Sequence, residues 1–481
     1  MSKHVPIIVV LICVWAISFI PFKIISHGYM PVDDALRHAA KAVSGKDWNK
    51  ILVLRDDIKM DSHVGWHAIL KGVRSAARLN TFELVLFSVI ALFMLFSLIG
   101  ILFLRRPEVW PITLLIMVVA DCGLVSRLLL GRPYIITMST ILALGLTWPR
   151  LRYEKNDFKA LSLLTLLIAV STWAHCGWYL FGLPILCFFL AREWRVGFRV
   201  AIATILGVAI GAVATGAPYL FLKQTLQHVS LAFGNHTLVR MLVTEFQPGL
   251  GSFSIIVVIS LMFIWRALRG SWNSKVVDNP FFILAVISWA LGFVTLRVLL
   301  DIGLPAIAVF IAKELEDFFE KRVGELSWKR VVLAILSCGI LYLAITNDVG
   351  SRWSGYHPYG YISMDDKRYE SWLPGKDGVI YSDDMGVFYT TFYKNPSAPW
   401  RYVLGFEPAI MPKDDLDIYR NIQLHHGDAN YFDPWVKKMR LQDRLIVLSP
   451  PEKRPAIKGL EWYNIPDIIW IGRIPKSEDS R

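Results

Sequence analysis

Charged residues are scarce in this sequence: Asp, Glu, Lys and Arg make up only 19% of its 481 residues, whereas 54% are hydrophobic. One soluble core cannot bury that much apolar surface, so lipid has to cover the excess. The mean hydropathy of +0.46 agrees with a polytopic membrane protein. The formal net charge of +12 does not indicate a nucleic-acid partner, because the basic residues cluster at the ends of apolar segments, as the positive-inside bias requires.

Cysteine is also rare, and all five cysteines lie in or beside apolar segments. This excludes a disulfide framework in the polar C-terminal portion, although we expect that portion to face an oxidising compartment. The Walker motif, the Gly-x-Ser-x-Gly motif and the dinucleotide-binding fingerprint are missing as well. Their absence argues against ATP-driven transport and serine-hydrolase chemistry.

Eleven apolar segments approach the length that a membrane-spanning helix needs, about 20 residues. Basic residues of the short loops fall on one side of the membrane if the N-terminus is cytoplasmic and the first helix is not cleaved. The expected fold class is therefore a polytopic α-helical membrane protein of about 11 transmembrane helices with a small extracytoplasmic α/β domain at the C-terminus. The expected spans lie near 5–22, 81–104, 111–130, 134–148, 159–173, 177–190, 198–222, 251–268, 280–299, 302–313 and 329–346.

The pattern changes near Asn347 from apolar segments to mixed polar and aromatic sequence. We expect a transmembrane domain over 1–346, with amphipathic helices in a first outer loop at 23–80, and an outer α/β domain over 347–481. In the outer domain, three short runs predict strands and two predict helices. The strands are expected at 378–382, 445–448 and 468–472, and the helices at 416–424 and 434–439.

The first outer loop holds the best catalytic candidates, Asp33 and Asp34, which follow Pro31 at the start of a helical run. One such carboxylate is an ordinary N-cap, whereas two suggest a general base or a metal ligand, because an attacking hydroxyl must lose its proton. Helical spacing predicts that Asp34 faces His38, which would orient it or bind a donor phosphate, and that Asp33 pairs with Arg37.

Asp61, His63 and His67 form a second cluster in the same loop. The two histidines stand one helical turn apart, a spacing that would suit a metal ion. An amphipathic helix lying in the membrane interface explains the same spacing without a metal.

Basic side chains at the outer ends of apolar segments form a third group: Arg132, His175 and Arg297. An arginine there would suit an anionic lipid head group, because guanidinium binds phosphate oxygens in a bidentate fork. Simple snorkelling to the interface explains Arg132 equally well, and an ion pair with Asp301 one turn later explains Arg297.

Together these features resemble the GT-C superfamily of integral-membrane glycosyltransferases, which take a sugar from a polyprenyl-phosphate donor. The shared layout is a cytoplasmic N-terminus, an acidic pair early in the first large outer loop (here Asp33-Asp34), many further spans and an outer C-terminal domain. The run Arg401-Tyr402-Val403-Leu404-Gly405-Phe406-Glu407-Pro408-Ala409-Ile410-Met411 looks like a Tyr-x-x-Gly-Leu-Asp-Pro-x-Tyr-Met stretch of uncharacterised bacterial GT-C-like proteins, with departures at Phe406 and Glu407. Gly131-Arg132-Pro133-Tyr134 has a similar counterpart there.

The resemblance implies a hexosyl or pentosyl transferase that moves a sugar from a polyprenyl-phosphate donor to a glycan, lipid or protein hydroxyl, outside a bacterial inner membrane. It implies Asp33 or Asp34 as the catalytic base, and outer arginines such as Arg297 as donor-phosphate ligands. Positive charge or a divalent metal, Mg²⁺ or Mn²⁺, would stabilise the departing phosphate. The choice between the two aspartates stays open.

Three other functions fit a chain of this kind. A transporter or flippase would show two related halves with broken helices at matching positions, and no such duplication is present. A polymerase or ligase of lipid-linked glycans would carry its large outer loop late in the chain. A non-catalytic GT-C-like scaffold would bind a partner through the C-terminal domain.

Overall fold

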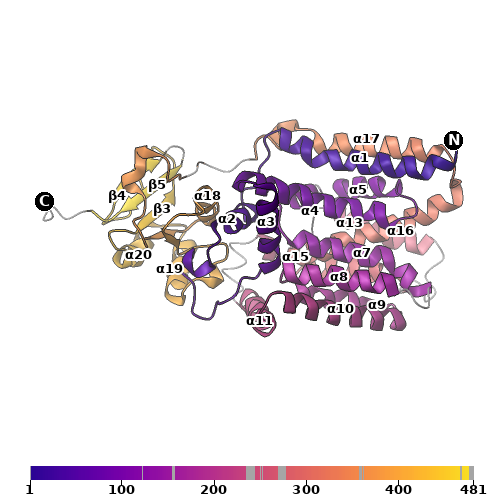
Figure 1. Cartoon of the computed structure of the whole chain (residues 1–481), viewed down its shortest axis with the longest axis horizontal. Coiled ribbons are helices and arrows are strands. Elements are labelled where there is room, and N and C mark those ends of the chain that lie inside the picture. The colour runs from indigo at the N-terminus through magenta and orange to yellow at the C-terminus, as the bar shows by residue number, and fades with distance from the viewer. Residues whose placement is uncertain are drawn as a thin grey trace.

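The chain forms a bundle of helices with a smaller, sheet-containing part at one end (Figure 1). The computed structural model describes residues 2–121, 123–153, 158–234, 244–249, 251, 253–268, 278–356, 360, 362–465 and 468–475. The N-terminus lies at the end of the bundle that is remote from the sheet (Figure 1). The first helix therefore runs from that remote end toward the sheet-containing part.

Apolar helices make up the bundle. In the described residues they are α1 (Val5–Ser26), α4 (Thr81–Phe103), α5 (Val109–Ala120), α6 (Gly123–Leu129), α7 (Tyr134–Tyr153), α8 (Phe158–Ala174), α9 (Gly182–Leu190), α10 (Trp194–Ala214), α11 (Pro218–Gly234), α13 (Phe253–Leu268), α14 (Pro280–Gly292), α15 (Leu296–Val298), α16 (Leu304–Arg322) and α17 (Lys329–Thr346). Four of these, α1, α4, α10 and α17, are long and apolar enough to cross a membrane, and the bent pair α5–α6 makes a fifth if counted as one span. The helical, membrane-type fold class is thus confirmed.

Helix α1 shows why lipid must surround the bundle. Val9, Cys13 and Ile17 are fully buried on one side of it, yet Leu11 and Trp15 on the other side are 61% and 66% exposed. A helix that is apolar all round belongs inside a large core or in a membrane. Since one face of α1 has no protein cover, the surrounding medium has to be apolar.

Several expected spans are broken in the structure. The segment near 111–130 is divided into α5 and α6, and the segment near 198–222 into α10 and α11. The segment near 280–299 ends in the short α15, and a π-helical turn, η6 (Leu299–Gly303), then leads into α16. The total of about 11 transmembrane helices therefore stays a prediction.

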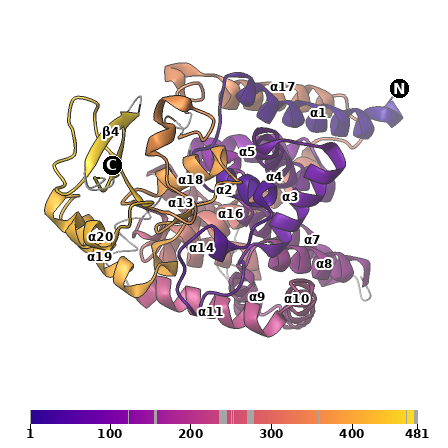
Figure 2. The same ribbon diagram turned by 60° about the vertical axis from the view of Figure 1, so that its left-hand side comes forward.

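The segment 23–80, named above the first outer loop from its expected orientation, lies across the end of the bundle, between the bundle and the sheet (Figures 1 and 2). It contains α2 (Asp34–Ser44), η2 (Trp48–Lys50) and α3 (Val64–Ala77). Helix α2 packs against α3, α4 and α18, and α3 packs against α8. Gly65 permits this last contact, because a Cβ there would lie 2.4 Å from the Trp173 ring.

The C-terminal part carries a five-stranded sheet in the order β2-β1-β3-β5-β4. Strands β1 (Val379–Ser382), β2 (Arg401–Tyr402) and β3 (Arg444–Leu448) are parallel, and β4 (Glu461–Ile465) and β5 (Ile469–Arg473) close the sheet as an antiparallel hairpin. Helices α18 (Met385–Lys394), α19 (Lys413–Leu424) and α20 (Asp433–Lys438) accompany it. All three expected strands and both expected helices are present, whereas β2, β4 and α18 had not been predicted.

Residues 51–55 of the first outer loop extend this sheet beyond its β2 edge. Tyr402 donates its backbone N–H to the carbonyl of Ile51 and accepts one from Val53, both at 2.9 Å, and Arg55 donates to Ile410 at 3.0 Å. An unpaired strand edge readily takes up another extended segment in this way. The first outer loop and the C-terminal part are therefore joined by backbone pairing.

Candidate functional site

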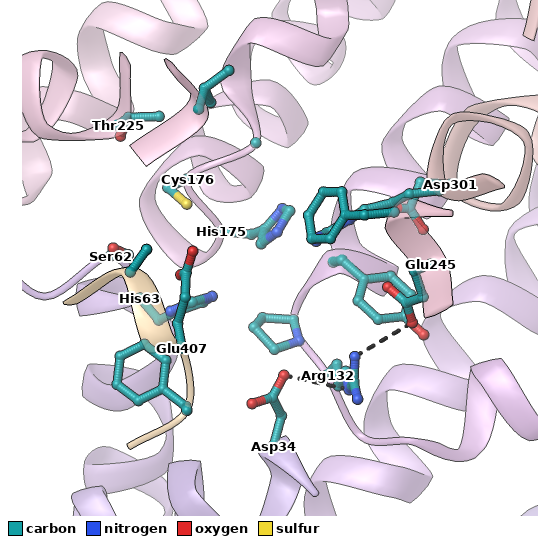
Figure 3. A pocket seen from close by; sticks show the side chains of 18 of the residues that line it. Asp34, Ser62, His63, Arg132, His175, Cys176, Thr225, Glu245, Asp301 and Glu407 are labelled. Atoms are coloured by element: carbon teal, nitrogen blue, oxygen red, sulfur yellow. Dashed lines mark hydrogen bonds and ion pairs between the residues drawn. The ribbon is translucent and has the colours of Figure 1, made fainter. Parts of the chain in front are cut away.

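A cavity of about 490 Å³ lies where the bundle, the first outer loop and the C-terminal part meet. Figure 3 shows side chains from all three pointing into it. Every site residue proposed from the sequence lines this cavity except Asp61 and His67. The lining residues from that set are Asp33, Asp34, His38, His63, Arg132, His175 and Arg297.

Asp33 occupies the N-cap position of α2, but its side chain does not cap the helix. Its Oδ2 accepts a hydrogen bond from Nη2 of Arg132 at 2.6 Å, while Oδ1 is buried without a partner among the described residues. Burial raises the pKa of Asp33 and outweighs the opposite effect of Arg132. The side-chain capping interpretation and the expected pairing with Arg37 are both wrong. Asp33 is instead a carboxylate with one uncommitted, comparatively basic oxygen.

Asp34 has more donors around it than Asp33. Its Oδ1 accepts from Nε of Arg37 at 2.5 Å and from the Tyr389 hydroxyl at 3.3 Å, and its Oδ2 lies 3.4 Å from Nε of Arg132. Burial raises the pKa of Asp34, but Arg37 and Arg132 outweigh it and the net pKa is lowered. Asp34 is thus an ionised acceptor that organises its neighbours.

His38 is hydrogen-bonded to His67 instead of Asp34, contrary to expectation. Its Nδ1 lies 2.8 Å from Nε2 of His67, whose Nδ1 lies 2.5 Å from Oδ2 of Asp61. Burial lowers the pKa of both histidines, so both rings are neutral near pH 7. Because ionised Asp61 only accepts, His67 carries its proton on Nδ1 and accepts from Nδ1–H of His38. Nε2 of His38 is then a bare, buried lone pair, with no partner in the described structure.

Asp61, His63 and His67 do not fit a metal ion in this arrangement. The described residues contain no group of three His, Cys, Asp or Glu side chains that could hold one. Both ring nitrogens of His67 are engaged as above, and its ring centroid lies 6.3 Å from that of His63.

His63 and His175 face the cavity as neutral rings (Figure 3). Their centroids are 5.9 Å apart, and Nδ1 of His175 lies 3.0 Å from the Thr137 hydroxyl. Burial lowers the pKa of His175 to about 4 and also lowers that of His63. Near pH 7, each ring can therefore hydrogen-bond a substrate, but neither supplies positive charge.

Arg132 does not offer the free anion site that its position suggested. Nη2 donates to Asp33, Nε lies near Asp34, and Nη1 lies 3.5 Å from Oε1 of Glu245. Burial alone would raise the pKa of Glu245, but Arg127, Arg132 and Arg297 outweigh it and hold the pKa at about 2. Because the Arg132 guanidinium lies against all three of these carboxylates, it positions them and is not free to bind an anion.

Arg297 uses only one nitrogen of its guanidinium for a hydrogen bond to the described residues. Its Nε pairs with Asp301 at 3.1 Å, so the expected intrahelical pair is confirmed, and Asp301 also accepts from Arg127. Nη1 and Nη2 of Arg297 have no hydrogen-bond partner among the described residues, although the guanidinium lies 5.4 Å from the Phe246 ring centroid, and the side chain is 35% exposed. Two free guanidinium nitrogens of this kind can bind an anionic group in a bidentate fork.

Sequence reasoning assigned no ligand role to Arg37, Tyr389 or Glu407, which also line the cavity. Tyr389 and Glu407 belong to the C-terminal part and reach the site only through the fold. In the sequence, only the departure of Glu407 from the GT-C-like stretch could have indicated that one of these residues belongs to the site. Comparison with known proteins assigns no family, because no family model and no curated protein matches the sequence.

Proposed function

We propose that the protein transfers a sugar from a polyprenyl-phosphate donor to an acceptor hydroxyl in this cavity, on the extracytoplasmic face of the membrane. The observation that carries the proposal is one cavity, at the end of an apolar bundle, that contains both Asp33 with an uncommitted oxygen and Arg297 with a free guanidinium fork. Such a transfer needs a base for the attacking hydroxyl and positive charge for the departing phosphate.

The proposed topology has a cytoplasmic N-terminus, about eleven crossings and an outer C-terminal domain. Two observations support it: the cavity and the sheet lie at the same end of the bundle, and the N-terminus lies at the opposite end (Figure 1). A phosphate carried on a membrane lipid sits at the level of the helix ends. The Arg297 fork lies just before π-helical turn η6, where it would meet such a phosphate.

Asp33 is the proposed base. The acceptor proton passes to its free Oδ1 while the acceptor oxygen bonds to the anomeric carbon. The bond between that carbon and the phosphate oxygen breaks, and its electron pair remains on the phosphate, next to Arg297. Attack opposite the leaving group inverts the anomeric centre. Asp34 is less suited to this role, because Arg37, Arg132 and Tyr389 surround its carboxylate.

The test of Asp33 is genetic and chemical. A deletion strain is complemented with the parent gene, Asp33→Asn or Asp34→Asn, and its envelope glycans are compared by mass spectrometry. We expect Asp33→Asn to lower transfer at least about 100-fold, the usual contribution of a general base. Asp366→Asn, which changes a carboxylate outside the cavity, serves as the control. Full transfer by Asp33→Asn would remove Asp33 from the mechanism.

Arg297 is tested by binding of undecaprenyl phosphate to purified protein in nanodiscs. Arg297→Gln should weaken this binding about tenfold or more, because a hydrogen bond to a charged group is lost. Arg368→Gln, at a largely exposed arginine, is the control. Equal affinities of Arg297→Gln and the parent would contradict a phosphate role.

A further inference from the structure

The backbone on both sides of Glu407 is held against the first outer loop. Glu407 lies between Tyr402 and Ile410, both of which are hydrogen-bonded through their backbones to the first outer loop. Gly405 presses against the same loop, since a Cβ there would lie 2.8 Å from Leu52. Figure 3 shows Glu407 pointing into the cavity beside His63, with Arg132 and Glu245 on the other side.

Glu407 differs from the other carboxylates of the cavity. Asp33, Asp34, Glu245 and Asp301 each pair with at least one arginine. Glu407 is half-buried, and its side chain has no ion pair or hydrogen bond to the described residues. Arg55, which also lines the cavity, is occupied by Asp57 at 2.7 Å and by the Ala409 carbonyl at 3.3 Å. Both oxygens of Glu407 are therefore available to a ligand.

Arg37 lines the same cavity and contacts Phe406, the residue before Glu407. Its guanidinium stacks on Phe406, 4.0 Å from the ring centroid, and its Nε is used by Asp34. The side chain is only 4% exposed, yet Nη1 is buried without a partner among the described residues. A buried charged donor left unpaired is costly, which indicates a missing ligand. Arg37 and Glu407 form no ion pair with each other, so both groups stay open.

We propose that Arg37 and Glu407 form a subsite for the hydroxyl groups of a carbohydrate. A hydroxyl both donates and accepts, so it can donate to Glu407 and accept from Arg37. Neither an anion nor a cation fits both groups, because Glu407 repels the first and Arg37 repels the second. Assigning this sugar to the acceptor rests on the proposed transfer, in which Arg297 takes the donor phosphate.

The binding test uses octyl glycosides (glucoside, galactoside and mannoside) and their fully O-methylated analogues, with the full-length protein in nanodiscs. Methylation removes the hydroxyl donors and keeps the ring and tail. We expect at least one glycoside to bind about tenfold or more tightly than its analogue, and Glu407→Gln or Glu407→Ala to abolish most of that difference. Glu452→Gln, an exposed glutamate of the same domain, is the matched control.

Two binding results would overturn the subsite: no preference for any free glycoside over its methylated form, or a preference that Glu407→Ala leaves unchanged. Because the Glu407 side chain makes no ion pair or hydrogen bond to the described residues, these variants should fold like the parent. Asp33→Asn should keep glycoside binding, so a failure of the transfer proposal is distinguishable from a failure of the subsite.

Kinetics add a second readout where transfer is measured. Glu407→Gln should raise the acceptor KM about tenfold and leave kcat within a few fold. Loss of kcat at unchanged KM would make Glu407 the proton acceptor and overturn its assignment as a binding residue.

Discussion

Removing the Arg132 guanidinium should destabilise the protein more than any surface change. Arg132 reaches three carboxylates: Asp33 at 2.6 Å, Asp34 at 3.4 Å and Glu245 at 3.5 Å. In Arg132→Gln these acids would face one another without their shared cation. The variant therefore loses attraction and gains repulsion at the same point.

The magnitude follows from burial. Removing one partner of a buried ion pair costs about 3–5 kcal/mol. Because the side chains of Arg132 and Asp33 are 21% and 17% exposed, solvent screens part of this energy, and we expect the low end, about 3 kcal/mol. Without Arg132 the pKa of Asp33 rises further, so a larger fraction of it is protonated near pH 7. The acid limb of any activity that needs ionised Asp33 should then move to higher pH.

Equilibrium unfolding of the purified protein in micelles, followed by tryptophan fluorescence, measures this effect. The double variant Arg132→Gln/Asp33→Asn removes both charges and should recover at least about 1 kcal/mol of the loss. Arg368→Gln, whose side chain is 68% exposed, should stay within about 0.5 kcal/mol of the parent. A fully stable Arg132→Gln variant, or a double variant whose losses simply add, would refute the reasoning.

Three further outcomes follow from single contacts. The folded pKa of Glu245, about 2, lies below its ordinary 4.5, so Glu245 contributes about 3 kcal/mol of stability above pH 4.5 that is lost as the pH falls toward 2. In Glu245→Gln, the free energy of unfolding should therefore fall less steeply as the pH is lowered from 4.5 toward 2. An unchanged dependence of the unfolding free energy on pH would contradict this assignment. Gly65→Ala should lower the unfolding midpoint, because its Cβ meets Trp173, whereas Gly72→Ala in the same helix, with nothing within 4 Å, should not. Val53→Pro removes the N–H bonded to Tyr402 and should make the first outer loop more sensitive to trypsin, and an identical digestion pattern would argue against the added strand.

Local sequence pattern was sufficient for many of the elements and for one pairing between neighbours, that of Arg297 with Asp301. The apolar run that became α1 and the strand runs that became β1, β3 and β5 carry their own hydrophobic signals. Arg297 and Asp301 pair because residues one turn apart share a helix face. By contrast, β2 has two residues and exists only because β1 and residues 51–55 flank it.

The side-chain pairings predicted from helical spacing were wrong where a residue distant in the sequence lies closer in the fold. Asp33 was expected to meet Arg37, but Arg132, 99 residues away, takes its carboxylate. Arg37 then turns to Asp34, which leaves His38 to bond His67 in α3. Helical spacing shows which neighbours in the same helix a side chain can contact. It does not show whether such a neighbour or a residue from a distant part of the chain will be the actual partner.

The pairing of residues 51–55 with the C-terminal sheet also constrains how the chain is made. Arg55 and its partner Ala409 are separated by 354 positions, so at roughly 5–20 residues per second the ribosome delivers the second about 20–70 s after the first. During that interval the bundle can enter the membrane while the segment after α2 still has no strand beside it. The wall that carries Glu407 can therefore close only late in synthesis, and a chain that stops before β2 should lack a finished cavity.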